Sequence, residues 1–477
     1  MKICIQKTQP MRPKKELQVM MKKFLSFGIL IAFISITPAP AFAVGSGGFE
    51  NASFSAKQLG LGAAVTATPD EPAAISYNPA GIADLPGIQV QGNANFISFM
   101  TFKKNSVEGN SRSTGTLNLV PTGYVTINPG KIFQNKLGLG IGMDSPFGLS
   151  NKYRSNDPSV KYSGYSNYLK MWTLKPTIAY KLTDKISVGG GPMWYRVEDF
   201  GGVQAYPSGA YPPPYGTGGG NGQVRLNTSG NHWGWQMGAL IKLTPKHRLG
   251  YYFRSPVVVK TSGLGKVENS SMAGSPGRFE TGVHTKLSLP MNMTWAYAYQ
   301  PTEKTHYEVD FTWSHWKTHK RLYWNVDPTG SVMDDAVMND IREADKDWRD
   351  SFGIQLGASH KLTKKLTLRG GSWFYWTPVP YDHFTPAVPD ANHWAVSIGA
   401  GYDINKYLTA DLCYYNSFYF RRHIKNPAAY VDGTYTSYSQ AFTISLTAKW
   451  DDIFPRSFGN KGTEAEAPSI DMPGATK

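Results

Sequence analysis

The strongest constraint on this chain is a period-two alternation of apolar and polar side chains that recurs between Gln89 and Trp450. Alternate residues of a β-strand point to opposite faces, so each alternating segment predicts a strand whose two faces meet different surroundings. Two apolar faces show it most clearly: Trp233, Trp235, Met237, Ala239, Ile241 and Leu243 in one segment, and Leu287, Leu289, Met291, Met293, Trp295, Tyr297 and Tyr299 in another.

Tight and long connections alternate between these segments. Three tight ones share the sequence Lys-Leu-Thr, at 181–183, 242–244 and 361–363, whereas the long ones, 201–231, 255–285, 317–350 and 416–437, are expected to be outer loops. The segments number about fourteen, and the last keeps strict alternation up to the aromatic residue Trp450. The sequence therefore predicts an all-β fold, a transmembrane antiparallel barrel of about 14 strands with its apolar face toward lipid.

Composition agrees with a barrel and argues against helical membrane spans. Aromatic residues make up 13% and charged residues 17% of the 477 positions, which suits a barrel with aromatic girdles. A spanning helix needs about 20 apolar residues in a row, and after residue 44 charges and amides interrupt every apolar stretch.

The N-terminus indicates export and supplies the first domain boundary. An apolar run at 24–33 follows two lysines and leads to Ala41-Phe42-Ala43, the small-x-small pattern of a signal peptidase site. We therefore divide the chain into an upstream extension with a cleaved signal peptide (1–43), an N-terminal hatch (44–87), the barrel (88–450) and a flexible C-terminal tail (451–477). The expected location is the bacterial outer membrane.

A barrel of about fourteen strands leaves a lumen that must be filled. Residues 44–87 lack alternation and are rich in glycine, alanine and turn signals, including Asn78-Pro79-Ala80. We interpret them as a hatch in the lumen, locked by that motif, because Asn78 can bond the turn backbone and Pro79 presets φ. A disordered periplasmic arm is the alternative, although apolar residues such as Phe49 and Phe54 favour packing.

Several motifs, in order, resemble the FadL-type channels: Gly60-Leu61-Gly62, Asn78-Pro79-Ala80, 231–235, 251–255, 313–316 and 377–380. The resemblance implies a fourteen-stranded barrel with an N-terminal hatch that takes up long-chain fatty acids or aromatic hydrocarbons. It also implies a lateral exit through a kink in the third strand. The tail after Trp450, and Gly81 after Asn-Pro-Ala, depart from the pattern.

The matching positions give candidate site residues. The third strand breaks at Ser145, Pro146, Phe147 and Gly148, where Pro146 cannot donate a ladder hydrogen bond, so we expect the lateral opening there. An ordinary strand end is the alternative.

For substrate binding we expect Phe49 and Phe54 in the hatch, together with two residues near the end of the strand that begins at Tyr307. Continuing that strand's parity points Trp316 inward as an apolar wall and Lys320 inward as a cation for an acidic head group. A solvated lysine on an outer loop is the alternative for Lys320.

Other classes of function fit less well. The net charge of +15 is scattered through the leader, loops and turns, so we expect no nucleic-acid partner. We expect no enzyme activity, since no catalytic Ser/His/acid cluster stands out. We also expect no cofactor or metal. His315 and His319 have the i, i+4 spacing of metal ligands on a helix, but on a strand or barrel rim that spacing does not place both on one helical face. A general porin, an adhesin or a lipid-modifying enzyme stay open as alternatives. The expected partners are a hydrophobic small molecule, outer-membrane lipid and lipopolysaccharide, and the expected state is a monomer.

Overall fold

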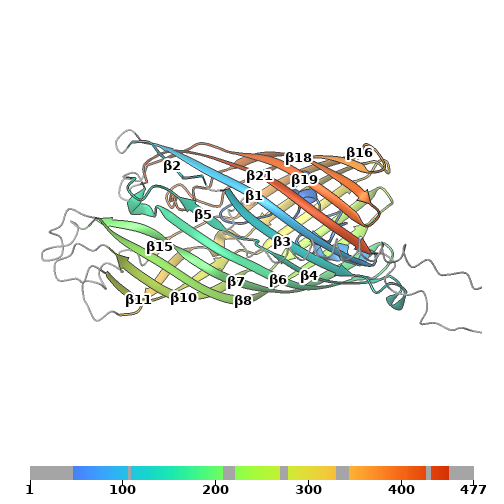
Figure 1. Cartoon of the computed structure of the whole chain (residues 1–477), viewed down its shortest axis with the longest axis horizontal. Helices are drawn as coiled ribbons and strands as arrows, with labels where there is room; N and C mark the ends of the chain where they lie inside the picture. Colours follow the sequence, from blue (N-terminus) through green and yellow to red (C-terminus); the bar gives the residue numbers. More distant parts are fainter. Residues whose placement is uncertain are drawn as a thin grey trace, which may run out of the picture.

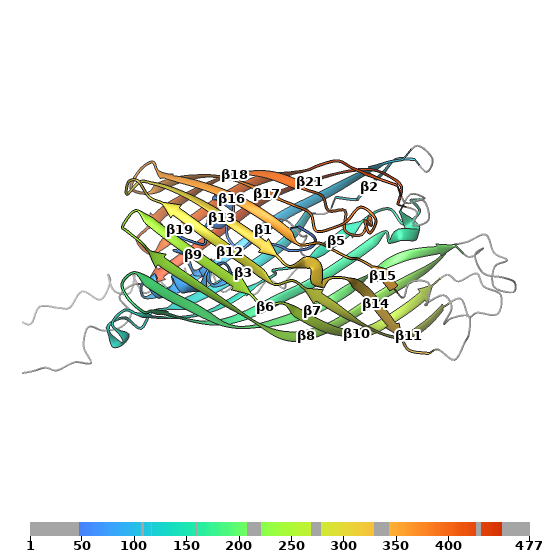
Figure 2. The same cartoon turned by 180° about the vertical axis from the view of Figure 1, so that it is seen from behind.

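The computed structural model describes residues 47–105, 109–115, 117–157, 160–207, 221–268, 278–328, 343–425 and 431–450. The expected signal peptide and C-terminal tail lie outside these residues. The described part forms an elongated barrel of tilted strands (Figures 1 and 2). In this part of the chain, no helix is long and apolar enough to cross a membrane.

The wall is a closed 14-strand antiparallel barrel, which confirms the predicted fold class. Its main strands are β1 (Ile88–Lys104), β3 (Leu117–Ile127), β4 (Leu137–Asp144), β6 (Ser166–Lys181), β7 (Ile186–Pro207), β8 (Asn221–Lys242), β9 (His247–Arg254), β12 (Asn292–Tyr299), β13 (Thr305–Ser314), β16 (Ser351–Lys361), β17 (Leu366–Tyr375), β18 (His393–Asn405), β19 (Leu408–Tyr419) and β21 (Gly433–Trp450). Closure is continuous, because β1 pairs with β21 from Ile88↔Trp450 to Lys104↔Thr434.

Further strands extend or flank this wall. They are β2 (Ser111–Arg112), β5 (Leu149–Lys152), β10 (Val257–Glu268), β11 (Arg278–Leu289), β14 (Arg321–Val326), β15 (Glu343–Asp345) and β20 (Arg422–Ile424). Single turns of 3₁₀-helix, η3 (Gly130–Phe133), η4 (Lys161–Ser163) and η6 (Trp316–Thr318), lie between strands.

One end of the barrel carries the short turns, and four of them are built alike. In each, a threonine hydroxyl accepts the backbone N–H groups two and three residues further on, at Thr183, Thr244, Thr302 and Thr363. Such local side-chain bonds fix a tight turn without help from tertiary contacts. Ile88 and Trp450 lie at this end too, because their strands start and finish there. We call it the short-turn end.

The predicted alternation, with apolar side chains outward, holds in the half of the wall next to the short-turn end. It inverts in the half away from that end. Trp295 and Tyr297 are exposed on the outside, whereas Leu287 and Leu289 are buried on the inside. The expectation that 287–299 forms one outward face is therefore wrong. Pro290 separates β11 from β12 and lacks the N–H that the ladder needs, so the two strands meet out of phase.

Two of the expected long loops, 201–231 and 255–285, are also largely strand. In the half of these strands away from the short-turn end, inward positions such as Val224 and Leu226 are apolar and buried. Outward positions there, such as Arg225 and Asn227, are exposed. The pattern is inverted there, which is why these polar stretches resemble loops in the sequence.

Residues 47–87, here called the hatch segment, fill the short-turn half of the lumen. They contain α2 (Ala56–Gly60), η1 (Pro72–Ser76) and η2 (Pro79–Asp84). Glycines of the wall let this segment approach closely. A Cβ on Gly238 would lie 2.2 Å from Oδ1 of Asn78, and one on Gly189 would lie 2.7 Å from the backbone of Pro79. The boundaries of the hatch as a domain stay a prediction.

Candidate functional site

The third strand of the wall breaks where the sequence predicts it. The ladder between β3 and β4 runs from Ile127↔Leu139 to Gly123↔Met143, and β4 ends at Asp144. After the break, β5 pairs with β6. Phe147, in the middle of the break, is fully buried and turned into the lumen. The wall is therefore irregular beside the outer part of β3.

The start of the hatch segment binds the broken backbone. Gly148 N–H donates to the carbonyl of Phe49 at 3.0 Å, and Asn51 N–H donates to the carbonyl of Pro146 at 2.8 Å. The side-chain amide of Asn51 donates to the carbonyl of Ser145 at 2.8 Å. Backbone groups without partners are costly in hydrocarbon, so these bonds let the break exist inside a membrane wall.

A buried ion pair fixes the same part of the hatch segment. The Glu50 carboxylate accepts a hydrogen bond from the Arg254 guanidinium, and it also accepts from Asn292 at 3.2 Å and Ser314 at 2.9 Å. Arg254 lies 4.6 Å above the centre of the Phe147 ring. One arginine thus contacts both the hatch segment and the break.

Phe49 is the centre of an aromatic cluster that separates the break from the outer lumen. Its ring lies 4.8 Å from Trp316, 5.6 Å from Trp348 and 6.1 Å from Phe147. All four side chains are buried. The contacts with Trp316 and Phe147 are edge-to-face and that with Trp348 is tilted, so the four rings close the lumen at this level.

An apolar cavity of about 210 Å³ lies on the outer side of Phe49. Its walls are the inverted apolar faces of the strands; residues that line it include Leu169, Phe200, Val224, Leu226, Leu287 and Trp324. Trp324 stacks on Phe200 with ring centres 5.3 Å apart. A cavity whose lining is mostly apolar, with a few polar groups such as Asn167 and Lys346, suits a hydrophobic ligand with a polar end.

Lys346 is the lysine among the lining residues of this cavity. Burial lowers the pKa of Lys346 to about 8, because the charged form loses part of its hydration. Lys320, the expected cation, is exposed instead and lines a separate outer depression. The prediction that Lys320 points inward was wrong, because β13 ends at Ser314 and the 3₁₀ turn η6 changes the direction of the chain before Lys320. The two residues are still neighbours, since Lys346 N–H donates to the Lys320 carbonyl at 2.7 Å.

The other predicted residues lie deeper, in the hatch segment. Phe54 packs in its core with Leu61 and Ile75, away from the outer cavity. Asn78 caps η2 by accepting the N–H of Ala80, and its amide donates to Thr66 O at 2.6 Å and Ala239 O at 3.0 Å. Asn78 therefore joins two parts of the hatch segment to the wall, as the proposed lock requires.

Sequence reasoning missed Arg254, Lys346 and Trp348. Arg254 carried a signal, because an arginine on the inward face of a membrane strand needs a partner. Lys346 and Trp348 lie in a polar stretch without periodicity and carried none.

A closed barrel with a hatch segment in its lumen and a break in its wall beside an apolar cavity defines a class of protein, the outer-membrane transport barrels. Residues 39–451 match the family model described as outer membrane protein transport protein (OMPP1/FadL/TodX). The chain belongs to this family, whose members transport compounds rather than catalyse reactions, and its location is the outer membrane.

Relatives and solved structures agree. The long-chain fatty acid transport protein of Salmonella typhi is 25% identical over 403 residues, 77% of this chain and 86% of that protein. Outer membrane protein P1 of Haemophilus influenzae is 24% identical over 434 residues, 79% of this chain and 88% of that protein.

Among solved structures, a Pseudomonas aeruginosa FadL homologue covers 84% of this chain and 99% of its own, with TM-score 0.71 and 19% identity. The Ralstonia pickettii toluene transporter TbuX covers 83% of this chain and 98% of its own, with TM-score 0.60 and 17% identity. At such identities these structures support the fold.

Proposed function

We propose that this protein is a passive uptake channel for long-chain carboxylic acids. The observation that carries the proposal is the apolar cavity beside Phe49, with the lysine Lys346 in its lining. A relative at 25% identity is named a long-chain fatty acid transport protein, which agrees with this substrate class. Toluene, the compound named for the Ralstonia pickettii transporter, could enter the cavity but would leave the lysine without a partner.

The proposed route runs from the outer loops into the cavity, past Phe49, and out through the break at 145–148. An apolar molecule gains little from a water-filled pore and more from a chain of apolar contacts that ends in the bilayer. Phe49 and Phe147 stand between the cavity and the wall, with ring centres 6.1 Å apart. Movement of these two rings would join the cavity to the lipid.

A general porin is the competing function. Its lumen would be open, whereas here the hatch segment makes hydrogen bonds to the wall around most of the lumen, for example from Ala56 to Ser445 and from Ala67 to Glu308. A planar bilayer measurement separates the two. The proposed channel passes few ions, and a steady conductance of porin size would contradict the proposal.

The direct test is uptake in a strain that lacks its own transporter. Cells with this protein should take up oleate faster than cells with an empty vector, and should take up toluene no faster. Equal rates with and without the protein for oleate would refute the proposed substrate class.

A further inference from the structure

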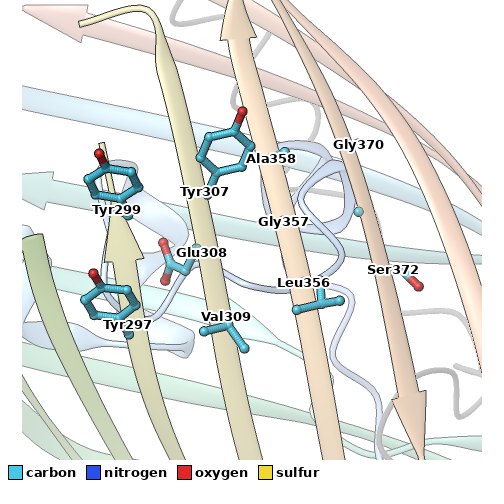
Figure 3. A pocket seen from close by; sticks show the side chains of 11 residues that line it. Tyr297, Tyr299, Tyr307, Glu308, Val309, Leu356, Gly357, Ala358, Gly370 and Ser372 are labelled. Carbon is cyan, nitrogen blue, oxygen red and sulfur yellow. The ribbon is translucent and has the colours of Figure 1, made fainter. Parts of the chain in front are cut away.

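The outer surface of the barrel carries a groove of about 460 Å³ across β12, β13, β16 and β17 (Figure 3). Its floor lies where outward positions hold small residues, at Ala358 and Gly370. A Cβ added to Gly370 would meet nothing within 4 Å, so the space above it is open. The groove is therefore a real depression in a wall that otherwise carries large side chains.

Large apolar and aromatic side chains form the rim. Tyr297, Tyr307 and Leu356 are 40%, 50% and 52% exposed on the outer surface. Figure 3 shows the hydroxyl groups of Tyr299 and Tyr307 directed toward the end where β12 finishes and β13 begins. Tyrosine with its ring in hydrocarbon and its hydroxyl toward water marks a membrane interface. The groove thus reaches from the apolar layer to the interface at the short-turn end.

The two turns beside the groove are basic. Lys304 and Lys361 are neighbours, because Lys361 N–H donates to the Lys304 carbonyl at 2.8 Å. Both side chains are exposed, as is that of Lys364, which lies in the same turn as Lys361. Tyr307 pairs with Ala358. Lys304 precedes Tyr307 by three residues and Lys361 follows Ala358 by three, so about 10 Å separates the groove floor from these cations. Glu303 is the single acidic residue within the turns 300–304 and 361–365.

We propose that this groove binds one anionic phospholipid from the leaflet at the short-turn end, independently of the proposed transport. An acyl chain would lie over Gly370 and Ala358, where it covers apolar surface. The lipid phosphate would lie at Lys304, Lys361 and Lys364, with His360 beside them, since His360 is exposed and bonded to Thr305 at 3.0 Å. The excess of positive charge favours an anionic lipid over a zwitterionic one.

Native mass spectrometry of the purified barrel tests the proposal. The protein is mixed with equal amounts of dioleoyl phosphatidylglycerol and dioleoyl phosphatidylcholine, and the lipids retained on the folded barrel are counted. We expect one phosphatidylglycerol per barrel to be retained in preference. Gly370→Phe fills the open space and should reduce its retention about tenfold, and so should the triple variant Lys304→Gln/Lys361→Gln/Lys364→Gln.

Matched controls separate this site from general lipid contact. Ala410→Phe adds the same ring on the outer face of β19, and Lys185→Gln/Lys246→Gln/Lys406→Gln removes three exposed lysines from other short turns. Both controls should retain the lipid like the wild type. Heat-modifiable gel migration reports whether each variant is folded. Equal retention of the two lipids by the wild type, or full retention by Gly370→Phe, would overturn the proposal.

Discussion

Glu50 in the hatch segment and Arg254 at the end of β9 form an ion pair in which both side chains are at most 4% exposed. They are 204 residues apart in the sequence, and the pair lies directly beside the break in the third strand. A buried charge without its partner is strongly unfavourable, so this pair requires the hatch segment to enter the lumen at this place.

Replacing Glu50 by Ala should therefore release the start of the hatch segment. Arg254 would be left as a buried uncompensated charge, which costs about 3–5 kcal/mol. The backbone bonds from 49–51 to the break would open, and single-channel conductance should rise. Lys57→Ala is the control, because the Lys57–Asp70 pair of the same segment is more exposed and worth at most about 1 kcal/mol. An unchanged conductance of Glu50→Ala would show that the pair does not hold the segment.

Asn78 offers a second test of the hatch. Asn78→Ala removes both amide bonds to Thr66 and Ala239 along with the cap, and should weaken the attachment by about 1–3 kcal/mol while the barrel still forms. Asn78→Asp keeps the oxygen that caps Ala80 but places a carboxylate against two carbonyl groups. We expect faster proteolysis of the hatch segment and impaired uptake in both variants. Wild-type behaviour of Asn78→Asp would assign the role to the cap alone.

The break in the third strand can be closed by removing one residue. Between the pairs Asp144↔Thr173 and Leu149↔Leu169, the broken strand has four residues (145–148) and β6 has three (170–172). Deleting Pro146 makes both counts three, and it restores the alternation between Asp144 and Leu149, which both face the lumen. We expect uptake of oleate to be lost while the barrel still folds. Deleting Pro328, an exposed proline outside the strands, is the control and should leave uptake unchanged. Normal uptake by the Pro146 deletion would place the exit at the short-turn end.

The sequence was informative wherever the barrel wall meets lipid, and much less so where it does not. The outward face at 233–243 was correctly assigned because water and lipid impose opposite polarities on alternate residues. On the side of Pro290 away from the short-turn end, the lumen is apolar and the outside is polar. The same alternation there assigns the apolar residues to the outer face, which is wrong. Parity alone cannot reveal such an inversion, because it depends on what the barrel encloses.

The candidate site shows the same division. The break at 145–148 was predictable from Pro146, whose missing N–H interrupts a regular strand. The contacts that surround it were not, because Phe49, Arg254 and Trp348 come from distant parts of the chain and meet only in the closed barrel. Lys320 was misplaced because one 3₁₀ turn after β13 resets the direction of the chain.

The last prediction concerns Lys346 and the charge of the substrate. Lys346→Gln should weaken binding of oleate by about 1.5–3 kcal/mol, as expected for loss of a charge-assisted hydrogen bond, and should leave an uncharged hydrocarbon unaffected. Lys320→Gln is the matched control, since Lys320 is exposed and does not line the cavity.

The pH dependence follows from the lowered pKa of Lys346, about 8. Below this pKa the lysine is charged and can pair with the carboxylate, and above it the free protein holds a neutral amine, so the affinity for oleate should fall as pH rises through about 8. The carboxylate is ionised throughout this window and does not contribute to the change. Titration calorimetry between pH 7 and 10 would detect the fall in the wild type and its absence in Lys346→Gln. An affinity of the wild type that is constant over this range would remove Lys346 from the binding site.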